Sequence, residues 1–128
     1  MAEIGIYIYV EGSDLDDVAN PIECELTEWL KKSEIEAKII NQKYERDPDM
    51  LPEDLTDWDL GLNFKFTDLI ILKIITDFVY SLGIKYNRTF ILGYFSDERG
   101  ISQDISHFGY EGGELNTNQV GRLIENVC

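Results

Sequence analysis

The sequence holds few of the side chains that usually carry out enzyme chemistry. His107 is its single histidine, and its two cysteines are Cys24 and Cys128. Nucleophilic catalysis needs a base within hydrogen-bond reach of a Ser or Cys nucleophile, and no motif around His107 suggests such a pair. A zinc site needs a cluster of Cys and His side chains, which three scattered positions do not indicate. We therefore predict no catalytic residue and expect that the protein is not an enzyme.

The acidic residues are numerous enough to raise the question of metal binding. Asp14-Leu15-Asp16-Asp17 and Asp47-Pro48-Asp49 lack the ligand spacing and the central Gly of a calcium-binding EF-hand loop. Residues 109–113 are rich in Gly but lack the Gly-Lys-Ser/Thr of a phosphate-binding loop. We predict no metal site and no cofactor. A hydrolase that uses two carboxylates stays open as an alternative, although nothing places two acids in a cleft.

The net charge limits the classes of partner. Eleven basic residues stand against 25 acidic ones, a net charge of −14. Affinity for nucleic acids and for anionic membranes depends mainly on Lys and Arg, so we predict neither as a partner. Two cysteines form no disulfide framework, and the apolar start of the chain lacks the basic region of a signal peptide. We therefore expect a cytoplasmic protein.

The negative charge is concentrated in two segments. Residues 11–30 hold seven acidic residues and no basic one, a net charge of −7. Residues 45–59 hold seven acidic residues against Arg46, a net charge of −6, and include large apolar side chains. A segment that mixes acids with apolar anchors can attract and bind a basic protein. The predicted partner-binding residues are Tyr44, Asp47, Asp49, Glu53, Asp54, Asp57 and Trp58.

The length of 128 residues predicts one domain, over residues 1–128, that is long enough to bury a core. Alternating apolar residues predict strands, and a 3.6-residue spacing predicts helices. The expected strands cover residues 4–10, 34–44, 58–66, 88–96 and 101–110, and the expected helices cover 67–82 and 117–127, with a further helix between about 14 and 32. Pro21 either kinks this further helix or separates a turn from a helix at 21–32.

The segment 67–82 is the most apolar of these helices. Thr67 is predicted to cap its first turn, and Gly83 is predicted to end it in a left-handed conformation. Its apolar residues form so wide an arc that neighbours must cover most of it. Ile71, Ile74, Ile75, Phe78 and Leu82 are expected on one side of this helix. Gly121, inside the last helix, costs about 1 kcal/mol relative to Ala and predicts close packing there.

The order of these elements predicts an α+β fold. It matches a ferredoxin-like βαββαβ core, with an added edge strand and a C-terminal helix. We expect an antiparallel sheet with two helices on one face.

A small acidic α+β domain without catalytic motifs resembles bacterial toxin-immunity proteins, including those of contact-dependent growth inhibition systems. The resemblance lies in the segments EGSDLDD and YERDPDMLPEDLTDWD, at residues 11–17 and 44–59. It implies an inhibitor that neutralises a basic toxin, commonly a nuclease, by covering the active site of the toxin. A ligand-sensing or regulatory domain, which a homodimer would suit, is the main alternative, and a nucleic-acid mimic is another.

Overall fold

The computed structural model of the chain describes residues 4–11, 15, 17–43, 58–96, 100–110 and 113–127. Five strands and three helices occupy these ranges. In chain order they are β1 (Gly5–Val10), α1 (Ala19–Ser33), β2 (Lys38–Lys43), β3 (Trp58–Lys65), α2 (Leu69–Tyr86), β4 (Thr89–Ser96), β5 (Ile101–Gly109) and α3 (Thr117–Val127). The predicted α+β class is therefore confirmed.

The strands form one antiparallel sheet in the order β2-β3-β1-β4-β5. β1 lies in the middle of the sheet, since it pairs with β3 on one side and with β4 on the other. β3 lies between β1 and β2, and β1 lies between β3 and β4. The fifth strand extends the sheet beyond β4, so its order differs from that of a simple four-stranded ferredoxin-like sheet.

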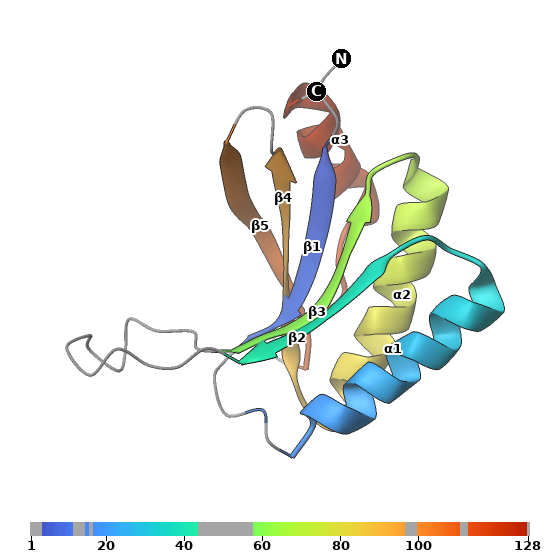
Figure 1. Cartoon of the computed structure of the whole chain (residues 1–128). Coiled ribbons are helices and arrows are strands. Elements are labelled where there is room, and N and C mark those ends of the chain that lie inside the picture. Colours follow the sequence, from blue (N-terminus) through green and yellow to red (C-terminus); the bar gives the residue numbers. More distant parts are fainter. Residues whose placement is uncertain are drawn as a thin grey trace, which may run out of the picture.

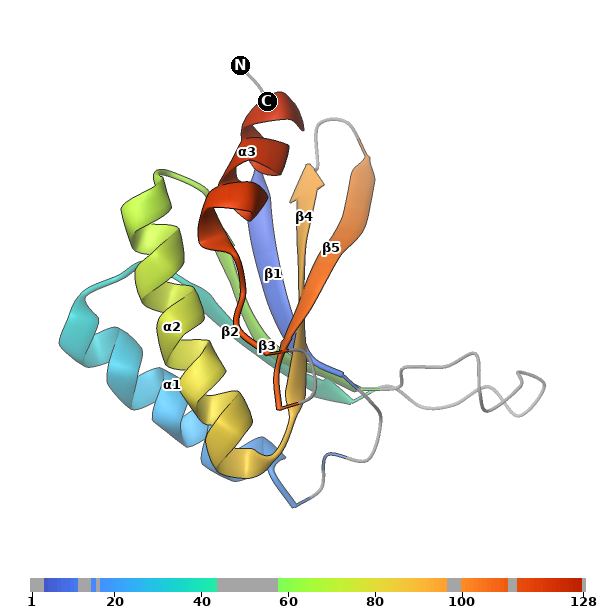
Figure 2. The same cartoon turned by 180° about the vertical axis from the view of Figure 1, so that it is seen from behind.

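The three helices cover one face of the sheet, with α2 between α1 and α3 (Figures 1 and 2). Alternate residues of the strands point into this layer because successive side chains of a strand face opposite ways. Ile6, Ile8 and Val10 of β1 are almost fully buried there, as are Leu60 and Leu62 of β3. The hydrophobic core therefore lies between the sheet and the helices.

The first helix resolves the alternatives that Pro21 left open. α1 begins at Ala19, so Pro21 lies in its first turn and the rest of the helix continues without a break. Proline is tolerated there because the first backbone N–H groups of a helix have no partner within the helix. The residue before the helix is Val18, whose side chain makes no capping hydrogen bond.

The predicted ends of the central helix are wrong by one residue at the start and by four at the end. α2 is capped by Asp68, whose carboxylate accepts from the N–H of Ile71 at 2.9 Å. It continues past Gly83 to Tyr86, and Asn87 takes the left-handed conformation with φ of 55°. Gly83 serves packing instead, because a Cβ there would lie 2.8 Å from the carbonyl oxygen of Arg88.

The buried face of α2 is also displaced from the predicted one. Leu72, Ile75 and Val79 are fully buried, whereas Ile74 is 43% exposed and Ile70 is 72% exposed. The sheet and the two flanking helices cover three sides of α2, which leaves the side of Ile70 and Ile74 to solvent. The close packing predicted at Gly121 is confirmed, since a Cβ there would overlap the side chain of Leu69.

The capping assignment leads to a first prediction. Asp68→Ala should lower the free energy of unfolding by about 1 kcal/mol, because one N–H of the first turn loses its acceptor. Thr67→Ala is the matched control, since the exposed Thr67 side chain has no hydrogen bond among the described residues. Urea unfolding followed by circular dichroism measures both. An equal loss from Thr67→Ala would contradict the assignment.

Candidate functional site

The residues predicted to bind a partner fall mostly outside the described ranges. Tyr44, Asp47, Asp49, Glu53, Asp54 and Asp57 all belong to residues 44–57, and of Trp58 only the backbone is described. Lys43 and Trp58 are paired in the antiparallel ladder of β2 and β3. Residues 44–57, called the acidic segment below, therefore connect two neighbouring positions of the sheet.

Acidic residues of other elements lie at this same end of the sheet. The register of β1 and β3 pairs Tyr9 with Gly61, so Glu11 and Asp59 follow two positions further along. Figure 1 shows that β1 and β2 end, and that β3 begins, at this end of the sheet. The N–H of Glu11 donates to the carbonyl of Thr89 at 2.8 Å, which holds the chain against β4 there. Two carboxylates thus lie beside the point where the acidic segment is attached.

Several acids of the first charged segment are already engaged within the protein. Asp17 forms an ion pair with Arg88 at 2.9 Å, and Glu23 accepts from the amide of Asn41 at 3.0 Å. Glu25 accepts from the Tyr86 hydroxyl and pairs with Lys85 at 2.9 Å. The Tyr86 hydrogen bond, helped by Lys85, lowers the pKa of the Glu25 carboxyl. These carboxylates join α1 and the segment just before it to neighbouring elements, so the net charge of −7 is not all available to a partner.

A second surface appears on the face of the sheet opposite the helices. Among the described residues, no helix covers this face, which is turned toward the viewer in Figure 1. Paired residues of neighbouring strands share a face, so the register places the side chains in rows. One row runs across all five strands and contains Lys38, Asn63, Tyr7, Gly93 and Asp104. The adjacent rows add Lys65, Phe95 and Ser102 on one side and Tyr9, Ile91 and His107 on the other.

The aromatic side chains of this face occupy space left by glycines. A Cβ at Gly93 would overlap the phenol of Tyr7, and one at Gly5 would overlap the ring of Phe95. The rings of Tyr7 and Tyr9 lie 5.4 Å apart between centroids. Each ring packs against the glycine backbone of a neighbouring strand, and this contact fixes the position of the ring.

Two hydrogen bonds fix the tyrosine hydroxyls. Tyr7 donates to Oδ1 of Asp104, and Tyr9 donates to Oδ1 of Asn63 at 2.9 Å. The resulting surface contains a shallow hollow of about 350 Å³, lined by Tyr7, Tyr9, Asn63, Phe95 and Ser102. We call this feature the tyrosine hollow. Its side chains come from four different strands, so the fold itself assembles it.

The environment of the hollow alters the acidity of both phenols. Burial, together with the hydrogen bond to Asp104 and the negative charge of that carboxylate, raises the pKa of Tyr7 well above its ordinary value. Burial also raises the pKa of Tyr9. Both hydroxyls therefore keep their protons, and act as donors, at neutral pH.

The raised pKa of Tyr7 leads to a second prediction. An unfolded tyrosine ionises near pH 10, so above that pH the unfolded state loses this proton before the folded state does. The free energy of unfolding should therefore fall as the pH rises from 9 to 11, by up to about 1 kcal/mol on account of this half-exposed group. Tyr7→Phe should remove that part of the slope in urea unfolding curves. If the free energy of unfolding fell equally steeply with pH in the wild type and in Tyr7→Phe, the prediction would be contradicted.

The sequence signal for the hollow was the alternation of Tyr7 and Tyr9 with the buried residues of β1. That alternation indicates aromatic side chains on one face, whereas the predicted partner-binding residues are a different set, in the acidic segment. Asp104 was not among the residues predicted from the sequence. Its contribution depends on the pairing of β5 with β4.

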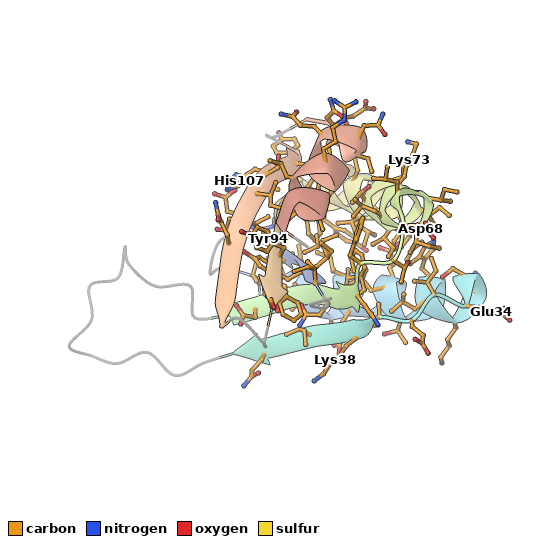
Figure 3. All side chains as sticks on the ribbon, turned by 90° about the horizontal axis from the view of Figure 1, so that it is seen from above. Glu34, Lys38, Asp68, Lys73, Tyr94 and His107 are labelled. Carbon is orange, nitrogen blue, oxygen red and sulfur yellow. The ribbon has the colours of Figure 1, made fainter. Side chains whose placement is uncertain are left out.

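The other residues considered for chemistry are dispersed. His107 points away from the helices on β5 (Figure 3), and Cys24 is exposed on α1 with a free thiol. In the described part of the chain, no three His, Cys, Asp or Glu side chains are grouped so that they could hold a metal ion. Within the same ranges, no helix has both the length and the apolar character needed to cross a membrane.

In comparisons with known proteins, the chain matches no protein-family model, no curated protein and no solved structure.

Proposed function

We propose that the protein is a cytoplasmic, non-enzymatic inhibitor that binds a basic protein through its acidic surface. Its closest functional counterpart would be an immunity protein that neutralises a cognate toxin. The proposal depends on one observation above all: residues 45–59 carry a net charge of −6, and the described residues on either side of positions 44–57, Lys43 and Trp58, are paired at an end of the sheet where Glu11 also lies.

The chemistry of nucleases explains why an acidic surface could inhibit one. A nuclease that binds phosphate groups must present Lys and Arg side chains in its substrate groove. A carboxylate-rich surface can occupy the same groove, since carboxylates pair with the same cations. Asp47, Asp49, Glu53, Asp54 and Asp57 would supply the carboxylates, and Tyr44 and Trp58 would supply apolar anchors in the contact.

We further propose that the first six elements form a ferredoxin-like core. Two β-α-β units support this assignment. One runs from β1 through α1 to β2 with β3 between these strands, and the other runs from β3 through α2 to β4 with β1 between them. In this interpretation β5 and α3 are additions at the β4 side of the core.

Capture of a partner tests the proposed function. The tagged protein is incubated at low salt with a lysate of the cell that produces it, and bound proteins are identified by mass spectrometry. We expect one basic protein, retained at low salt and bound more slowly at high salt, because salt screens attraction between exposed charges. The purified partner must then lose its activity when one equivalent of this protein is added. A partner that is acidic, or one that stays active in the complex, would refute the proposal.

A further inference from the structure

The tyrosine hollow has a distinctive distribution of hydrogen-bonding groups. The hydroxyl hydrogens of Tyr7 and Tyr9 are already donated to Asp104 and Asn63. Within the described ranges, Oδ2 of Asp104 accepts no hydrogen bond from the protein. The Asp104 carboxylate, held by the Tyr7 hydroxyl, is therefore next to a hollow that the rings of Tyr7, Tyr9 and Phe95 line.

An arginine guanidinium matches this combination. Aromatic faces attract cations because the ring quadrupole is negative above and below the plane. The guanidinium is planar, stacks on aromatic rings and donates several N–H groups to a carboxylate, whereas the lysine ammonium is a compact and more strongly hydrated charge. Asp104 would accept its N–H groups while the tyrosine rings contact its plane.

The other charges on this face define the side from which a cation could approach. Lys38 lies on β2 and Lys65 on β3, both in rows that cross the hollow. Lys38 points away from the helices at the β2 edge of the sheet (Figure 3). Asp104 lies on β5 at the opposite edge. Repulsion from the lysines therefore favours entry of a cation from the β5 side.

The geometry points to the tyrosine hollow as the receptor for an arginine side chain of the basic partner. This inference rests on the proposed function for the identity of that partner. Charge complementarity supports it in two ways: the whole protein carries a net charge of −14, and the Asp104 carboxylate is bonded to the hydroxyl of Tyr7, one of the three aromatic residues that line the hollow. The acidic segment would then supply attraction, and the hollow would supply a contact specific for arginine.

A titration with a small probe tests the hollow without the partner. N-acetyl-arginine amide is added to isotopically labelled protein, and amide chemical shifts are followed by nuclear magnetic resonance. We expect saturable shifts at Tyr7, Asn63 and Ser102, with a dissociation constant on the order of millimolar. N-acetyl-citrulline amide has nearly the same shape without the charge, and it should bind at least about fivefold more weakly.

Two variants of equal charge separate the hollow from general acidity. Asp104→Asn should weaken binding of the arginine probe at least about fivefold. Glu28→Gln, which removes an exposed carboxylate from α1, should leave the dissociation constant within about twofold. Shifts spread over the acidic surface, equal binding of the citrulline probe, or equal effects of the two variants would each overturn the inference.

Asp104→Asn also separates this inference from the proposed function. If a captured basic protein binds Asp104→Asn as tightly as the wild type, the hollow is not its arginine receptor, and the inhibitor proposal stands. If the probe binds in the hollow but no basic protein is captured, the inhibitor proposal fails, and the assignment of the hollow to arginine stands.

Discussion

Gly61→Ala should lower the free energy of unfolding by about 3 kcal/mol, the largest effect that we expect from a single methyl group in this protein. Gly61 lies in β3 with φ of +159°, and a Cβ there would overlap the carbonyl oxygen of Ile8. That oxygen belongs to the backbone of the central strand, so it cannot rotate away as a flexible side chain could. Relief requires displacement of β3 from β1, whose pairing holds the middle of the sheet.

Gly100→Ala is the matched control for this substitution. Gly100 has φ of +64°, but among the described residues beyond its chain neighbours none has an atom within 4 Å of the position that its Cβ would take. Its replacement should therefore cost only the left-handed backbone strain, about 1 kcal/mol. Urea unfolding of both variants, followed by circular dichroism, gives the two free energies. Equal losses would show that backbone strain, and not the contact between β3 and β1, makes glycine necessary at position 61.

Local patterns predicted the elements of this fold well because each pattern reflects burial. Strict alternation in residues 58–66 gave β3 almost to the residue. The ends of α2 were harder to predict because neighbouring residues offer competing signals. Thr67 and Asp68 are both good caps, and Gly83 and Asn87 both tolerate a left-handed conformation. Packing decides between Gly83 and Asn87. The carbonyl oxygen of Arg88 lies so close to Gly83 that the residue at position 83 cannot have a Cβ.

The tyrosine hollow depends on relations between strands, which a local pattern does not contain. β5 has a register irregularity opposite Leu92 and Gly93: Leu92 pairs with Ser106, whereas Gly93 pairs with Asp104. The additional residue, Ile105, shifts the alternation by one position, and so brings Asp104 onto the face of Tyr7. The two residues that form the hydrogen bond are 97 positions apart in the chain. Neither the irregularity nor this distant pairing leaves a signal in the sequence of β5.

The acidic segment, unlike the tyrosine hollow, can be recognised from a local pattern. Its charge is evident from the sequence alone, and the fold adds the position at which it is attached. Lys43 and Trp58, the described residues on either side of it, are paired in the sheet, so its six acidic residues before Trp58 belong to the single connection between β2 and β3. A partner would meet this charge in one region. Its effect should therefore appear mainly in the rate of association.

Charge reversal within this segment should have the largest effect on function. Changing Asp47, Asp49, Glu53 and Asp54 to Lys reduces the net charge from −14 to −6. The association rate with the basic partner should fall by about 100-fold at low salt, because long-range attraction raises such rates by roughly 10- to 1,000-fold. Stopped-flow fluorescence measures the rate, and the difference between the two proteins should shrink as salt is raised.

A second variant with four reversals shows whether location or total charge is responsible. Glu28, Glu34, Glu36 and Asp77 are exposed acids outside the segment, and their change to Lys gives the same net charge of −6. If the segment is the binding surface, this control should slow association much less than the first variant, because distant charges are screened beyond about 10 Å at moderate salt. Equal rates for the two variants would assign the attraction to the whole molecule. An unchanged rate in the first variant would exclude the segment from the interface.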